Sequence, residues 1–117
     1  MDRDPLLFLE DILDSIRHIE SYTAGLTFES FRDDTLIQDA VLRRLEIIGE
    51  AVKHLPASIR DKYPDVPWRK IAGTRDVLVH GYFGVDLELT WTTVKQHLPQ
   101  LVRQISEIVA ELRRKQL

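Results

Sequence analysis

The sequence predicts an all-α fold, a single-domain antiparallel bundle of four to five helices over residues 1–117. Two observations lead to this prediction. Apolar residues recur at spacings of three and four along most of the chain, as on the buried face of a helix. One short apolar run, Val77–Val79, could instead be a buried strand, but no second run of that kind exists to pair with it. A bundle of helices is therefore favoured.

The composition fits one globular domain. Hydrophobic residues make up 44% of the 117 residues and charged residues 30%, enough for a single core. No apolar run approaches the ~18 residues of a membrane span, and the acidic N-terminus lacks the apolar part of a signal peptide. The absence of cysteine excludes disulfides and suits a cytoplasmic protein. Since the net charge is −3, any nucleic-acid contact must be local or depend on oligomerisation.

The first helix is expected to begin at Asp4-Pro5, an acidic N-cap followed by proline, and to end at Ala24-Gly25. Residues 27–34 are expected to form a connection or a short helical turn, with their phenylalanines in the core. The buried stripe of this helix comprises Leu9, Ile12, Leu13, Ile16 and Ile19.

The second helix is expected from about Asp34 to His54, with apolar residues on more than one face. Gly49 lies inside it at a helix-propensity cost of roughly 1 kcal/mol, which close helix packing would explain. Pro56 ends the helix, and residues 56–62 could form a short helical turn.

Three further segments follow. The third segment of the chain begins at Pro67-Trp68, and Gly81 and Gly84 lie around its end. Asp86 is expected to cap a helix that runs from Leu87 to about His97. The last helix has the most regular apolar pattern: Leu98, Leu101, Val102, Ile105, Ile108, Val109 and Leu112.

Common catalytic and metal-binding motifs are missing. The four histidines are dispersed and lack the spacing of metal ligands. The glycines do not form a phosphate-binding loop, and no serine has the context of a nucleophile elbow. We therefore expect neither a metal nor a cofactor.

One cluster stands apart, because Arg75, His80 and Tyr82 fall within eight residues. The plain interpretation is that Arg75 forms a surface ion pair, His80 lies at a helix end and Tyr82 packs in the core. In an ideal helix Arg75 and Tyr82 would lie about 20° apart, but His80 would lie about 140° from Arg75. Arg75 and His80 could thus act together only if the helix loosens near Gly81 or a second chain contributes.

The stretch Pro67–Phe83 resembles the signature of the HepT family, small toxins of the HEPN superfamily with the motif R-x4-H-x-Y. Leu45–Ala51 and Val85–Glu88 also resemble the family pattern, so the resemblance covers nearly the whole chain. One departure is Asp76, where these proteins commonly carry Asn.

The resemblance implies an HEPN-like, dimeric helical domain and a metal-independent endoribonuclease toxin of a type VII-like toxin-antitoxin pair, with tRNA as substrate class. It implies that Arg75 and His80 are catalytic. It also implies an MntA-type minimal nucleotidyltransferase as antitoxin, which attaches AMP to Tyr82. Asp76 and Glu50 are candidate supporting residues: Glu50 could orient Arg75 or simply form a surface ion pair.

The residue chemistry is compatible with this activity. Histidine can exchange protons near neutral pH, and arginine presents a planar fork to phosphate oxygens. One His80 cannot be acid and base at once, so a twofold dimer that shares one cleft would supply both groups. The alternative is a non-catalytic dimeric helical module that binds a nucleotidyltransferase partner or a nucleotide. A purely structural bundle is a third possibility.

Overall fold

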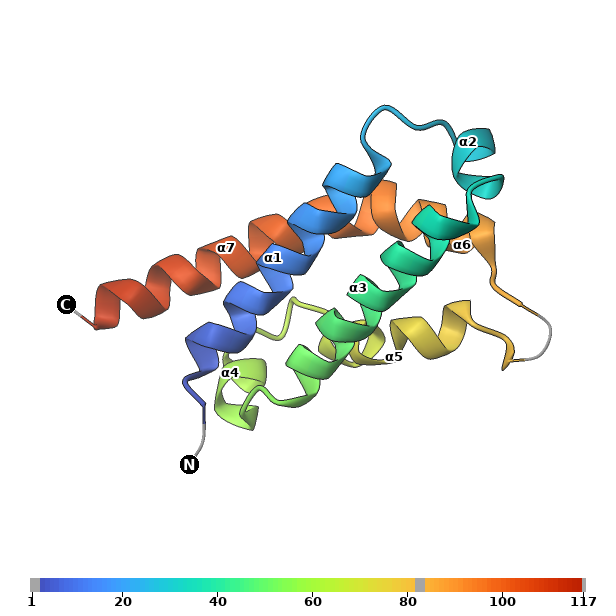
Figure 1. Cartoon of the computed structure of the whole chain (residues 1–117). Helices are drawn as coiled ribbons and strands as arrows, with labels where there is room; N and C mark the ends of the chain where they lie inside the picture. Colours follow the sequence, from blue (N-terminus) through green and yellow to red (C-terminus); the bar gives the residue numbers. More distant parts are fainter. Residues whose placement is uncertain (1–2, 82–83, 117) are drawn as a thin grey trace.

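The computed structural model describes residues 3–81 and 84–116, and its helices are labelled in Figure 1. The first, α1 (Pro5–Thr23), begins where the sequence predicts. Asp4 is its N-cap, and the Asp4 carboxylate accepts a hydrogen bond of 2.9 Å from the Leu6 amide. Pro5 occupies the first turn, where no amide hydrogen is needed.

The most extensive contact between helices joins α1 to α3 (Thr35–Lys53). Asp34 caps α3 by accepting a hydrogen bond from the Ile37 amide at 3.1 Å. Between them lies the short helix α2 (Phe28–Arg32), the helical turn that was one of the two expected forms of this segment. Phe31 is fully buried there, 5.2 Å from the Trp91 ring between centroids.

After α3 the chain forms the short helix α4 (Ala57–Lys62) and then α5 (Trp68–Leu78), which packs on α3. The α3–α5 contact is close at Gly49, since a Cβ atom there would lie 3.1 Å from the carbonyl oxygen of Ala72. This confirms close helix packing as the reason for a glycine inside α3.

The final part of the chain runs through α6 (Leu87–Thr92), a π-helical turn η2 (Thr93–His97) and α7 (Leu98–Lys115). Asp86 caps α6 through the Leu89 amide at 3.0 Å. The segment expected to be one helix up to about His97 is thus α-helical only to Thr92. Because the backbone stays helical through η2, α6 continues into α7 without a loop.

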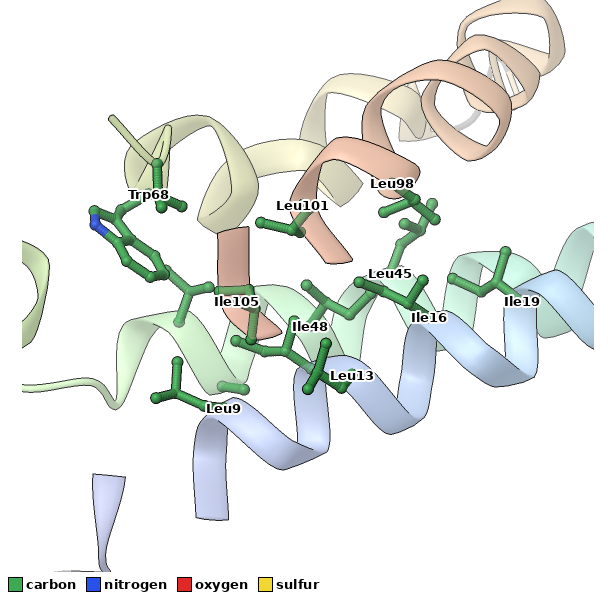
Figure 2. Packing of buried hydrophobic residues seen from close by; sticks show 14 of the residues in the cluster. Leu9, Leu13, Ile16, Ile19, Leu45, Ile48, Trp68, Leu98, Leu101 and Ile105 are labelled. Atoms are coloured by element: carbon green, nitrogen blue, oxygen red, sulfur yellow. The ribbon is translucent and has the colours of Figure 1, made fainter. Parts of the chain in front are cut away.

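The core lies where α1, α3 and α7 face one another, with α5 covering one side (Figures 1 and 2). Figure 2 shows residues of all four helices meeting there. The residues of this core are apolar and almost inaccessible to solvent. Those on the four helices include Leu9, Ile12, Ile16, Ile19, Val41, Ile48, Leu78, Ile105 and Ile108. The buried stripes of the sequence are therefore the ones that build the core.

The predicted all-α fold is confirmed. The described residues contain more helices than the four or five expected, because both short connections are helical and α6 is separate from η2. The third segment also ends earlier than expected, at Leu78 rather than near Gly81. Within residues 3–81 and 84–116, no helix is both long enough and apolar enough to cross a membrane.

Candidate active site

Arg75 lies in the last turn of α5, and 46% of its side chain is exposed. The helix closes with a hydrogen bond of 3.0 Å from the Val79 amide to the Arg75 carbonyl oxygen. A cation in this position is favoured by the partial negative charge of a helix C-terminus. The guanidinium is therefore accessible on an ordered helical turn.

His80 follows the end of α5, in the loop that joins α5 to α6. The Asp86 amide donates to the Leu78 carbonyl oxygen at 2.8 Å, and the His80 amide donates to the Gly84 carbonyl oxygen at 2.7 Å. Between these bonds, Val79 and Val85 form an antiparallel bridge. The bridge explains why α5 ends early: Val79 is extended and pairs across the loop instead of continuing the helix.

Glycines permit this loop. Gly81 has φ +56° and Gly84 has φ +98°, values that residues with a Cβ atom rarely adopt. His80 is exposed between these positions and the helix end. The separation of about 140° expected for a continuous helix does not apply, because α5 ends two residues before His80. Among the described hydrogen bonds and ion pairs, none joins the side chains of Arg75 and His80.

Among the described residues, the carboxylate closest to Arg75 is that of Glu46 on α3. Its Oε2 atom lies 3.4 Å from Arg75 Nε, and its Oε1 atom accepts a hydrogen bond of 2.6 Å from Arg43 Nη1. Asp76 Oδ1 is farther away, 4.0 Å from Arg75 Nη1, and its side chain is 80% exposed. Glu46 therefore lies between two arginines.

Glu50, the carboxylate singled out in the sequence, lies one turn further along α3. It forms an ion pair of 3.2 Å with Lys53, which is the surface pair considered as the alternative. Glu50 and Arg75 line the same small hollow of about 140 Å³, but Glu46 makes the contact with Arg75. Sequence reasoning missed Glu46 and Arg43, although the spacing of three and four residues places both on the Glu50 side of α3.

A second hollow, of about 260 Å³, opens on the other side of the Arg75–Glu46 pair. Arg43 and Arg75 border this hollow, and Val79 and Val85 form an apolar part of its wall. A different hollow of about 300 Å³ lies between α3, α5 and the start of α7, and its lining includes neither Arg75 nor His80. The space beside the two arginines is thus separate from it.

Two further sequence expectations concern this region. Tyr82, the expected modification site, lies outside the described residues. As for metals, no group of three or more histidine, aspartate and glutamate side chains suited to a metal ion occurs among residues 3–81 and 84–116.

Fold and site together define an all-α domain that presents an arginine at a helix end and a histidine in the loop that follows. Comparison with known families gives a match to the ribonuclease HepT-like family over residues 12–108. The chain therefore belongs to this family, which confirms the family indicated by the sequence motif. The match contains Arg75, His80 and the whole of α3.

Individual relatives agree. The chain is 46% identical over 101 residues to a Thermococcus cleftensis protein named "Probable ribonuclease HepT", covering 86% of this chain and 92% of the relative. It is 48% identical over 112 residues to the Methanocaldococcus jannaschii protein named "Gamma-glutamylcyclotransferase and putative RNase MJ0434". That alignment covers 96% of this chain but half of the relative's length. No solved structure gave a significant match.

Proposed function

We propose that this chain is a metal-independent endoribonuclease in which Arg75 and His80 act on the phosphodiester bond. The proposal rests on one observation: a chain of the ribonuclease HepT-like family exposes an arginine at the end of α5 and a histidine just beyond it. The Asp86 amide donates to Leu78 and the His80 amide donates to Gly84, so the His80 backbone is hydrogen-bonded just beyond the end of α5.

Cleavage without a metal needs three events. The 2′-hydroxyl loses its proton, the 2′-oxygen attacks phosphorus, and the departing 5′-oxygen gains a proton. The imidazole of His80 can act as the base or the acid in these proton transfers. Arg75 stabilises the charge that builds on the non-bridging oxygens. This route leaves a 2′,3′-cyclic phosphate and a 5′-hydroxyl.

In this proposal the active species is a homodimer. One imidazole cannot be general base and general acid in the same step, so a second copy of the motif supplies the other group. A shared cleft also doubles the number of cations facing the RNA, which suits a chain with a net charge of −3.

The biological role proposed is that of a cytoplasmic toxin acting on tRNA. Its antitoxin would be an MntA-type nucleotidyltransferase that transfers AMP to Tyr82. Tyr82 follows His80 by two residues, so an added adenylate would bring negative charge and bulk close to the cationic site. RNA binding would then be blocked.

The test is incubation of wild-type protein and His80→Ala with total tRNA in EDTA. His18→Ala is a matched control, because His18 is also exposed but lies on α1. We expect cleavage by the wild type and the control, none by His80→Ala, and cyclic phosphate ends. Intact tRNA with every protein would refute the ribonuclease proposal. RNA binding without cleavage would instead favour the non-catalytic helical module.

A further inference from the structure

The arrangement of Arg43, Glu46 and Arg75 carries an inference beyond the family assignment. Each oxygen of the Glu46 carboxylate faces a different arginine, Oε1 at 2.6 Å from Arg43 and Oε2 at 3.4 Å from Arg75. We propose that Glu46 is a positioning residue that fixes the guanidinium of Arg75, and that Arg43 is a second binding group for RNA phosphate. The inference rests on the proposed role of Arg75.

The geometry around Arg75 supports the positioning role. A guanidinium can form paired hydrogen bonds along its side, through Nε and one Nη, or along its end, through both Nη atoms. Glu46 faces Nε, so it contacts the side of the Arg75 guanidinium and does not cover the end edge formed by the two Nη atoms. Asp76 lies 4.0 Å from Nη1, beyond hydrogen-bond distance. Among the described residues no side chain hydrogen-bonds this end edge, so it can receive a phosphate in a defined orientation.

The charges around Arg43 support the binding role. Glu46 supplies one negative charge and the two arginines supply two positive charges, so the triad keeps an excess positive charge. Arg43 and Arg75 border the same hollow of about 260 Å³, and two thirds of the Arg43 side chain is exposed. Asp39, one turn before Arg43 on α3, also borders the hollow, and its carboxylate offsets this excess charge towards the start of the helix, so a phosphate is favoured nearer the two arginines.

The chain offers a close control for Glu46. Glu50 lies on the same helix one turn later, lines the smaller hollow together with Arg75, and pairs with Lys53 at 3.2 Å. Removal of either carboxylate changes the net charge by the same amount on the same helix. A difference between the two variants therefore reports the contact with Arg75 and not charge alone.

The first measurement does not depend on cleavage. In ¹⁵N NMR spectra, we expect the Nε–H signal of Arg75, assigned through its loss in Arg75→Lys, to be protected from solvent exchange in the wild type. Glu46→Gln should shift this signal and speed its exchange at least about tenfold, whereas Glu50→Gln should leave it unchanged. Equal behaviour of the two variants would overturn the positioning role.

The second measurement uses a 2′-O-methyl oligoribonucleotide, which cannot be cleaved through its blocked 2′-oxygen. Arg43→Gln should weaken binding and reduce the slope of log K against log salt by about one, as expected for one lost phosphate contact. Arg44→Gln, which removes the neighbouring arginine of α3, is the control and should reduce the slope less. Equal slopes for wild type and Arg43→Gln would overturn the binding role.

Cleavage kinetics separate the two roles. Glu46→Gln should lower kcat about tenfold or more with little change in KM, and Glu46→Asp should recover part of the loss. Arg43→Gln should mainly raise KM. If the wild type cleaves no RNA, the proposed function fails, while the NMR and binding measurements still decide the positioning and phosphate-binding roles. A loss of kcat as large in Glu50→Gln as in Glu46→Gln would overturn the inference.

Discussion

Gly49 on α3 lies directly under the carbonyl oxygen of Ala72 on α5, so that a Cβ atom at Gly49 would be 3.1 Å from that oxygen. The contacted atom belongs to helix backbone and cannot turn aside as a flexible side chain would. The site arginine is three residues further along α5. The spacing of the two helices, and with it the placement of Arg75 beside Glu46, therefore depends on this glycine.

Substitution of the two helical glycines should have opposite effects. Gly49→Ala gains about 1 kcal/mol in helix propensity but must push α5 away, at a typical overpacking cost of about 1–3 kcal/mol. Gly73→Ala in α5 meets no atom within 4 Å and should stabilise the protein by about 0.5–1 kcal/mol. Urea unfolding measures both values, and a stabilised Gly49→Ala would contradict the close contact.

Acid should weaken the attachment of α4 to α7 through Glu111. The Tyr63 hydroxyl donates to Glu111 Oε2 at 2.6 Å, and Lys62 Nζ lies 2.9 Å from Oε1. These hydrogen bonds lower the pKa of Glu111 to about 2. Because the folded-state pKa lies below the unfolded value of about 4.5, the stabilisation is complete above pH 4.5 and is lost as pH falls towards 2.

Glu111→Gln tests that expectation. The variant should unfold at lower urea concentration than the wild type at pH 7, and the difference should shrink as the pH is lowered towards 2. Glu107→Gln, which alters another carboxylate of α7, is the control. A difference between wild type and Glu111→Gln that does not depend on pH would argue against the ionised carboxylate as its source.

The loop that carries His80 should be sensitive to residues with a Cβ atom. Gly84 has φ +98°, outside the left-handed region that asparagine tolerates. Its carbonyl oxygen accepts a hydrogen bond from the His80 amide. Gly84→Ala should therefore cost about 1–3 kcal/mol of local strain and displace His80. Gly81→Asn should be tolerated better, since Gly81 has φ +56°.

Hydrogen exchange at the His80 amide and RNA cleavage report this effect together. We expect faster exchange and slower cleavage in Gly84→Ala, with smaller changes in Gly81→Asn. Identical behaviour of the two variants would mean that the backbone conformation at Gly84 does not hold His80 in place.

Mixed dimers test the shared cleft. If two chains build one site, a mixture of Arg75→Ala and His80→Ala chains should recover part of the activity that each variant lacks alone. Co-expression with two affinity tags allows the mixed species to be purified and compared with each parent in a tRNA cleavage assay. Absence of recovery in folded mixed dimers would place a complete site within one chain.

Much of the fold follows from local signals in the sequence. Three aspartates, Asp4, Asp34 and Asp86, were expected at or next to helix starts and act as N-caps. The end of α5 was predicted less well, because Val77–Val79 suits a helix as well as a strand. There the outcome depends on pairing with Val85, which a local pattern does not contain.

The candidate site divides in the same way. Arg75 and His80 stand out by residue type and spacing, and the family match contains both. The choice between Glu46 and Glu50 could not be made from the sequence, since both lie on one side of α3 a single turn apart. It depends on where α5 crosses α3, and that crossing is set by contact at Gly49.

The π-helical turn η2 has a consequence for how this chain can change in length. A turn bonded from i to i+5 holds one residue more than an α turn, so it stores a single-residue insertion inside an otherwise continuous rod. Deleting the exposed Gln96 would convert the turn to regular α-helix without rotating α7 against α6. A deletion inside α3, by contrast, would turn every following side chain by about 100° and expose part of the core.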